Sequence, residues 1–186
     1  MKFGESAIVS EKKSTSSITV IESQGEDRDC SFFTPADSVT FRPITTADLE
    51  EVMMIERASF HYPWSPGFFR QEMQVACARS ILAETEGQVV GYILFWLLPG
   101  AIDIHNIAVH IDYRRRGIAR LLLSKVVTEA QRQSVIRVML EVRRSNLAAQ
   151  KLYESVGFFS TGVRKGYYSD NSEDALAMTL EVPPKR

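Results

Sequence analysis

Cysteine and histidine are scarce in this sequence of 186 residues. The two cysteines, Cys30 and Cys77, stand far apart, and there are only three histidines. We therefore expect neither a disulfide framework nor a zinc site. Long apolar runs are missing too, since no stretch approaches the ~20 apolar residues of a membrane helix and the first residues lack the apolar core of a secretory signal. A cytoplasmic location is the expectation.

Charge of one sign is not in excess, because 22 basic and 23 acidic residues leave a net charge of -1. Such a chain gives no general basis for binding nucleic acid or a membrane surface. The one dense basic run is Arg114, Arg115 and Arg116. Residues 1–38 hold four basic and seven acidic side chains without a sustained apolar period, so we interpret them as a flexible N-terminal extension before one domain at 39–186.

Short strand-like and helix-like patterns follow from residue 39. We expect strands at 39–44, 80–86, 89–97, 102–109, 136–142, 158–163 and 175–182, with a hairpin turn at 87–88. Helices are expected after the capping pattern Thr45-x-x-Asp48, after Ser65-Pro66, from Gly117 to about residue 133, and from Asn146 to Gly157. This order predicts a mixed α+β fold.

One expected strand breaks its own alternation. Ile102 and Ile104 share one phase, whereas Ile107 and Val109 share the other, which a regular strand does not permit. An extra residue near His105, a β-bulge, would account for the switch. A strand that parts from its neighbour there would offer backbone groups to an extended, amide-containing ligand.

A candidate anion-binding loop follows that strand. The segment 113–120 places consecutive backbone N–H groups and an expected helix start where the strand ends. Gly117 allows the backbone to approach a phosphate closely, and the arginines add charge. A glycine among arginines also occurs on plain solvated surfaces, so the loop gains weight only beside the bulged strand.

Together the strand and the loop resemble the GNAT acetyltransferase superfamily, whose motif Arg/Gln-x-x-Gly-x-Gly/Ala stands here as Arg114-x-x-Gly117-x-Ala119. Separated motifs within residues 39–182 are similar to the bacterial RimI branch of ribosomal-protein-alanine N-acetyltransferases. These motifs are at 62–65, 106–109, 140–146, 152–158, 167–168 and 173–175. The resemblance implies a GNAT fold, with a mixed, mostly antiparallel sheet, one splayed and bulged strand, and flanking helices.

The resemblance also implies roles for particular residues. Glu141 would be the proton acceptor and Tyr153 the proton donor. Acetyl-coenzyme A would be held by Ile107, Ala108, Val109, Arg114, Arg115, Arg116, Gly117, Ile118, Ala119, Arg120 and Asn146. The acceptor peptide would be flanked by Pro63, Trp64, Tyr167 and Tyr168. No metal ion is implied.

The residues themselves are compatible with these roles but leave alternatives open. Glu141 alternates with Leu140 and Val142, so it leaves the aliphatic side of its strand, as any exposed strand carboxylate would. Tyr153 lies on the apolar stripe of its helix, where a core tyrosine would lie too. His105, next to the bulge, could act as a second base, although a histidine there is more often structural.

The acceptor follows from amine chemistry and from the resemblance. A free α-amine has a pKa of about 8, so it is close to losing its proton at neutral pH. A lysine amine has a pKa of ~10.4, so its deprotonation at neutral pH corresponds to a pKa lower by about 3, or about 4–5 kcal/mol. One modest base therefore favours an N-terminal amine, by resemblance the alanine of the eighteenth small-subunit ribosomal protein. Two alternatives stay open: a GNAT enzyme that acetylates lysine or a small amine, and a non-enzymatic module that binds RNA or an acidic protein.

Overall fold

The computed structural model of the protein describes residues 39–183. The extension predicted at 1–38 lies outside the described residues. Seven strands and four α-helices occur with two 3-10 helices in the described range. In chain order they are β1 (Thr40–Arg42), η2 (Thr46–Asp48), α1 (Leu49–Ser59), α2 (Pro66–Glu72), β2 (Ala78–Thr85), β3 (Gln88–Leu98), β4 (Ala101–Val109), η3 (Ile111–Tyr113), α3 (Ile118–Arg132), β5 (Arg137–Arg143), α4 (Leu147–Val156), β6 (Phe159–Tyr168) and β7 (Glu173–Glu181).

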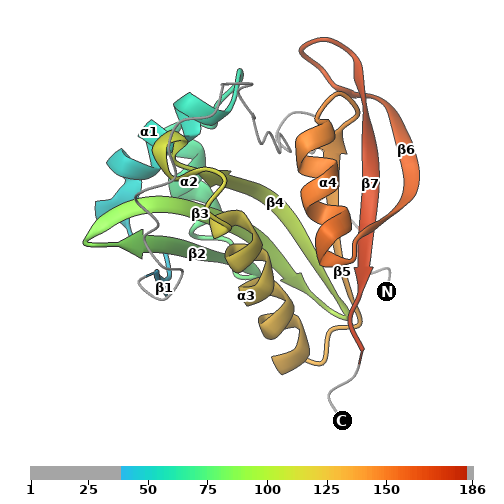
Figure 1. The fold of residues 1–186 in the computed structure, drawn as a ribbon, viewed down its shortest axis with the longest axis horizontal. Helices are drawn as coiled ribbons and strands as arrows, with labels where there is room; N and C mark the ends of the chain where they lie inside the picture. Colours follow the sequence, from blue (N-terminus) through green and yellow to red (C-terminus); the bar gives the residue numbers. More distant parts are fainter. Residues whose placement is uncertain (1–38, 184–186) are drawn as a thin grey trace, which may run out of the picture.

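The strands form one mixed sheet in the order β1-β2-β3-β4-β5-β7-β6. Every neighbouring pair in it is antiparallel except β4 and β5, which are parallel. Those two strands pair only from Ala101 opposite Arg137 to Ile104 opposite Leu140. Both continue beyond that point, and Figure 1 shows them diverging from their shared end. The predicted fold class and the splayed strand are confirmed.

Helices cover both faces of the sheet (Figure 1). Leu122 of α3 and Tyr153 of α4 share one buried cluster with Ile104 of β4 and Leu140 of β5. On the other face, α1 and α2 pack over the β2–β3 side of the sheet in a second cluster that includes Phe69. The candidate site lies where β4 and β5 part, beyond their last paired residues Ile104 and Leu140.

The predicted β-bulge lies at His105. On β3, Leu94 is opposite Asn106 while Phe95 is opposite Ile104, so His105 is the extra residue. The extra residue returns Ile107 to the face that Ile104 occupies, and both belong to the cluster under α3 and α4. The broken alternation in the sequence is therefore explained by the bulge.

Local signals fix three helix ends as expected. Ser65 Oγ accepts a hydrogen bond from the Phe68 N–H at 3.1 Å, and Pro66 occupies the first turn of α2. Asn146 Oδ1 accepts from the Ala149 N–H at 3.1 Å and caps α4. Gly157 ends α4 at a φ of 106°.

Three sequence expectations are wrong in detail. The β2–β3 turn is Glu86–Gly87 rather than 87–88, because both residues adopt positive φ, 51° and 76°, as a type I′ turn requires. Ile136 precedes β5 and is 63% exposed, since Val135 takes the buried position instead. The last two strands are longer than predicted, because register shifts in β6 hide its period.

Candidate active site

The two sides of the β4–β5 separation carry different chemistry. On β4, the buried residues Ile107, Ala108 and Val109 pair with β3 along one edge. Beyond Ile104 their other edge has no strand partner in the described part of the chain. On β5, Glu141 is the first residue after the pairing ends. An extended ligand with amide groups could pair with the open edge of β4.

Glu141 lies on the sheet face away from α3 and α4, as its alternation predicts. It is 9% exposed, and its neighbour on β7 is the small residue Ala177. Glu141 Oε1 lies 3.0 Å from Arg164 Nη2 of β6. The Arg164 guanidinium in turn lies 5.6 Å from the centre of the Tyr167 ring. Sequence reasoning missed Arg164, because the register shifts of β6 leave no period from which its direction could be read.

Tyr153 is fully buried on α4, and its hydroxyl has no hydrogen-bond partner within residues 39–183. Burial, followed by the nearby Tyr168 phenol, raises the pKa of Tyr153 well above its ordinary value. Tyr168 also interacts electrostatically with Glu141. Tyr168 therefore links the two residues, because it interacts with both Tyr153 and Glu141. The Tyr153 phenol is protonated at neutral pH and can donate a proton.

Arg143 holds Tyr168 in place. Its guanidinium lies 3.8 Å from the centre of the Tyr168 ring and is bonded to Asp170 at 2.9 Å and to Glu173 at 3.1 Å. Burial opposes ionisation of Glu173, but hydrogen bonds from Ser145 and Arg143 outweigh it and lower the pKa of Glu173 to about 2. The tip of the β6–β7 hairpin is thus fixed beside the end of β5.

The predicted anion loop forms the start of α3. Gly117 adopts a φ of 80°, and the first helical hydrogen bond runs from the Leu121 N–H to the Gly117 carbonyl at 3.0 Å. The amides of Ile118, Ala119 and Arg120 precede that bond, so they have no partner inside the helix. Free N–H groups at a helix start lie at the positive end of the helix dipole, so they suit a phosphate.

The four arginines of this loop play different parts. Arg114 is half-buried and donates from Nε to the Val109 carbonyl at 3.1 Å and from Nη2 to Ser59 Oγ at 3.0 Å, and burial lowers its pKa. Arg114 therefore braces the loop against β4 and α1. Arg116 lies over the Tyr113 ring, and Arg120 donates to Ser155 of α4 at 2.8 Å. Arg115, Arg116 and Arg120 are exposed and add positive charge at the surface.

The residues predicted to flank the acceptor divide between core and surface. The Trp64 ring is 5% exposed and contacts the Phe68 ring at a centroid distance of 4.4 Å, so it packs in the core beneath its loop. Pro63 is exposed, Tyr167 is half-buried and Tyr168 is buried. Pro63 and Tyr167 are therefore accessible to an acceptor peptide, whereas Trp64 and Tyr168 are covered.

A buried carboxylate that sequence reasoning missed fixes the bulge. Glu56 of α1 has no exposed surface and accepts hydrogen bonds from the Tyr92 hydroxyl, from Asn106 Nδ2 at 3.2 Å and from the Trp64 N–H at 2.8 Å. Burial raises the pKa of Glu56 despite these bonds. The sequence gives only a weak signal for this residue, because a glutamate in a helix is normally expected to be exposed even when its neighbours are apolar.

Within residues 39–183 no cluster of three or more His, Cys, Asp or Glu side chains could hold a metal ion. In the same range no helix is both long and apolar enough to cross a membrane.

Comparison with known proteins gives the family. Residues 49–158 match the acetyltransferase (GNAT) family. The chain is 33% identical to the [ribosomal protein bS18]-alanine N-acetyltransferase of Escherichia coli K12, over 77% of this chain and 97% of that protein. It is 36% identical to the N-alpha-acetyltransferase RimI of Mycobacterium tuberculosis, over 76% and 92%.

Solved structures agree with the sequences. The crystal structure of the Escherichia coli ribosomal-protein-S18-alanine N-acetyltransferase superposes with a TM-score of 0.73 at 32% identity, over 80% of this chain and 96% of that one. Ard1 from Thermoplasma volcanium gives a TM-score of 0.73 at 26% identity, over 78% and 99%. The chain therefore belongs to the GNAT acetyltransferase family and is an acyltransferase.

Proposed function

We propose that this enzyme is an N-α-acetyltransferase that moves an acetyl group from acetyl-coenzyme A to the N-terminal alanine of ribosomal protein bS18. The observation that carries the proposal is the carboxylate of Glu141 where β4 and β5 part, linked through Tyr168 to one buried phenol, Tyr153. The acceptor is supported by the Escherichia coli relative, whose name states this reaction and which matches over almost its whole length. Because the proposed acceptor is a protein of the ribosome itself, we propose a cytoplasmic location.

The residues present fit acetyl-coenzyme A, which supplies an activated acetyl thioester when bound. The open edge of β4 at Ile107, Ala108 and Val109 suits amide groups of an extended arm. The amides at Gly117 to Arg120 suit a pyrophosphate, and Arg115 and Arg116 add charge beside it. Arg114 contributes by fixing the loop, and Asn146 by capping α4.

Glu141 and Tyr153 divide the proton transfers. Glu141 accepts a proton from the acceptor nitrogen, either directly or through water, and Tyr153 gives a proton to the sulfur that leaves. The buried Tyr153 hydroxyl has no hydrogen-bond partner in the described residues, so it is available to bond to a substrate atom and donate its proton. Pro63 and Tyr167 flank the incoming peptide at the surface, with Trp64 and Tyr168 supporting them from the core.

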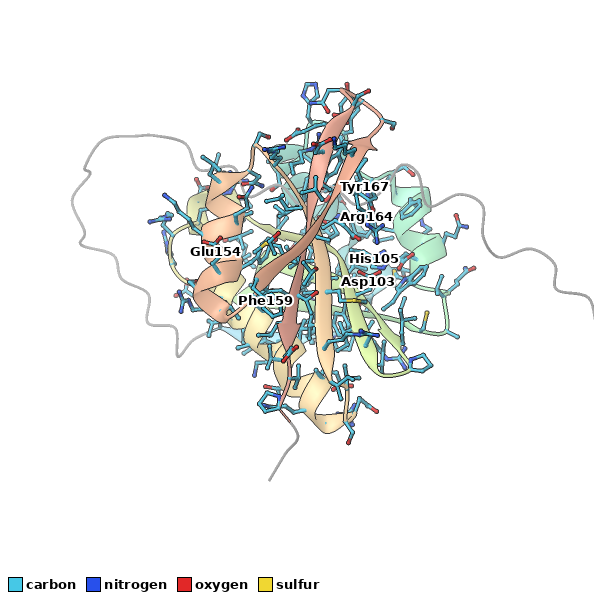
Figure 2. All side chains as sticks on the ribbon, turned by 90° about the vertical axis from the view of Figure 1, so that its right-hand side faces the viewer. Asp103, His105, Glu154, Phe159, Arg164 and Tyr167 are labelled. Atoms are coloured by element: carbon cyan, nitrogen blue, oxygen red, sulfur yellow. The ribbon has the colours of Figure 1, made fainter. Side chains whose placement is uncertain are left out.

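Thiol release from acetyl-coenzyme A tests the function. An alanine-initiated peptide of the acceptor is compared with its N-terminally blocked twin that contains lysine. We expect turnover only with the free N-terminus and about a 100-fold loss of kcat in Glu141→Gln. Glu154→Gln, an exposed carboxylate on the outer side of α4 in Figure 2, is the matched control and keeps wild-type turnover.

Turnover of the blocked peptide would instead show a lysine acetyltransferase, and turnover confined to small amines would show a small-molecule enzyme. Equal turnover by wild type and Glu141→Gln would remove Glu141 from the proposed mechanism while leaving the acceptor assignment intact.

A further inference from the structure

The proposed chemistry requires the acceptor to lose two protons, and Glu141 accounts for one. An α-amine is mostly an ammonium ion at neutral pH, because its pKa is about 8. It must lose one proton to become nucleophilic and a second as the amide forms. A second proton acceptor beside Glu141 is therefore useful to an enzyme of this kind.

The bulge of β4 places a histidine where such an acceptor would act. His105 and Asn106 are the two consecutive residues of the bulge opposite Leu94, so both side chains leave the face that Ile104 and Ile107 occupy. Asn106 is held by Glu56 of α1. His105 is thereby brought onto the same face as Glu141.

Strand register puts His105 next to Glu141. Ile104 of β4 and Leu140 of β5 are the last paired residues, so His105 and Glu141 are the next residues on the two parallel strands. Both stand on the sheet face opposite α3 and α4, at the point where the strands part. In Figure 2 Tyr167 and Arg164 of β6 and His105 and Asp103 of β4 are labelled one below another on the right-hand side, while Phe159 and Glu154 are labelled on the left.

The imidazole is oriented by two neighbours. His105 Nε2 lies 3.6 Å from Asp103 Oδ2, with side-chain exposures of 14% and 21%. Its ring packs against the Trp96 ring at a centroid distance of 4.5 Å. Trp96 is in turn fixed by a hydrogen bond from its indole N–H to Glu72 of α2. The neighbouring carboxylate stabilises the positive charge that the imidazole carries once it has taken up a proton, and part of the side chain reaches water although Nε2 itself is buried.

We infer that His105, oriented by Asp103, is the base that converts the acceptor ammonium into a neutral amine. This inference rests on the proposed function. One proton passes from the ammonium to the His105 imidazole and then to solvent. The neutral amine attacks the thioester carbonyl, and as the C–N bond forms its second proton goes to Glu141. The C–S bond breaks with a proton from Tyr153, which is reprotonated by the proton that Glu141 took up.

Charged and titratable groups from each neighbouring element shape this base. They are Asp103 on β4, Glu141 on β5, Arg164 and Tyr167 on β6, Glu72 on α2 and Glu56 on α1. Arg164 is paired with Glu141, and Glu56 is held within its own buried network. Asp103, 3.6 Å from the imidazole, is thus the carboxylate that the test must remove.

The pH profile of kcat/KM distinguishes a base from a structural histidine. We compare wild type with His105→Phe, which keeps a ring against Trp96, and with His105→Gln, from about pH 6 to 9.5, using the alanine-initiated peptide. At pH 7 both variants lose about 10- to 100-fold in kcat/KM. The loss shrinks as the pH rises above about 8, because the amine then arrives without its extra proton.

Two further variants complete the test. Asp103→Asn shows a smaller loss with the same pH trend. His110→Gln removes another imidazole that lies near an aspartate, 3.8 Å from Asp112, and keeps the wild-type profile. The KM for acetyl-coenzyme A and the thermal midpoint stay close to wild type in the His105 variants.

A loss that is equal at every pH would make His105 a structural residue, and no loss at all would remove it from the reaction; either result overturns the inference. Failure of the proposed function looks different, because wild type would then turn over a lysine peptide or a small amine instead, and the same pH comparison on that amine tests His105. Absence of turnover with every amine overturns both.

Discussion

Two tyrosine hydroxyls stand out among the buried side chains. The hydroxyls of Tyr153 and Tyr168 are buried without a hydrogen-bond partner in the described range. Leaving a buried polar group unpaired costs about 1–3 kcal/mol. Tyr92 is just as buried, but it donates to Glu56. The two unpaired phenols interact with each other, and Tyr168 also interacts with Glu141, so both belong to the surroundings of the candidate site.

Replacement of Tyr153 by Phe should separate activity from stability. The change removes a hydroxyl that bonds to nothing in the described structure, so the free energy of unfolding should stay the same or rise by up to ~1 kcal/mol. Turnover should fall by about 100-fold. Denaturant unfolding and thiol release measure the two effects.

Tyr92→Phe is the matched control. It removes a hydroxyl of equal burial that is bonded, so unfolding should become easier by about 1–3 kcal/mol. A Tyr153→Phe protein that is destabilised as strongly as Tyr92→Phe would mean that Tyr153 has a structural bond and is a poor candidate for the proton donor.

At the scale of elements, single residues tie helices to the site. Glu56 joins α1 to β3, to the bulge of β4 and to the Trp64 loop. Gly117 leads into α3 with a positive φ of 80°, a backbone conformation that residues with a Cβ rarely adopt. Helix and loop positions at the site therefore depend on residues that carry out no chemistry.

Glu56→Ala should destabilise the protein by about 3 kcal/mol, because it leaves the Tyr92 hydroxyl, the Asn106 amide and the Trp64 N–H without their buried acceptor. Chemical denaturation measures the loss. Glu50→Ala, an exposed change on the same helix, should alter stability by less than about 0.5 kcal/mol. Equal effects of the two changes would contradict the structural role of Glu56.

Gly117→Ala should weaken cofactor binding. An added Cβ would meet no atom within 4 Å, so the change acts through the φ of 80° and should cost about 1–2 kcal/mol. Gly87→Ala at the β2–β3 turn has a φ of 76° and equally open surroundings, so it should cost the same stability. Calorimetric titration with acetyl-coenzyme A should show weaker binding only for Gly117→Ala; equal affinities would exclude the loop from cofactor binding.

At the scale of the whole molecule, the sheet is continuous at one end of β4 and β5 and open at the other. The parallel pairing is limited to Ala101–Ile104 opposite Arg137–Leu140. The buried cluster under α3 and α4 joins the two halves of the sheet below that opening. Ion pairs of Arg143 with Asp170 and Glu173 hold the β6–β7 hairpin against β5. Hairpin stability should therefore depend on pH.

Acid should weaken the fold partly through Glu173. Its pKa falls from 4.5 to about 2 on folding, so its contribution is fully present above about pH 4.5 and is lost as the pH falls toward 2. The stability difference between wild type and Glu173→Gln, measured by denaturation at several pH values, should shrink across that window. A difference that stays constant would show that the Glu173 carboxylate is not stabilised by its partners.

Much of the architecture could be predicted from local patterns. Caps at Ser65 and Asn146 and the stop at Gly157 act within one turn of chain, so the sequence is enough to place them. The β6 strand was predicted too short, because its register shifts depend on pairing with β7 and not on its own period. The partners of Glu141 and Tyr168, Arg164 and Arg143, were missed for the same reason.

The sequence by itself determined the order of elements, the bulge of β4, the glycine-containing start of α3 and the family, because each depends on residues close together in the chain. Tertiary structure alone decided which side chains meet. It buries the Tyr153 hydroxyl beside Tyr168, pairs Glu141 with Arg164 and sets Asp103 beside His105 at the strand separation. The physical reason is that strand register and burial are set by long-range contacts, and these choose the neighbours and the local dielectric of each group.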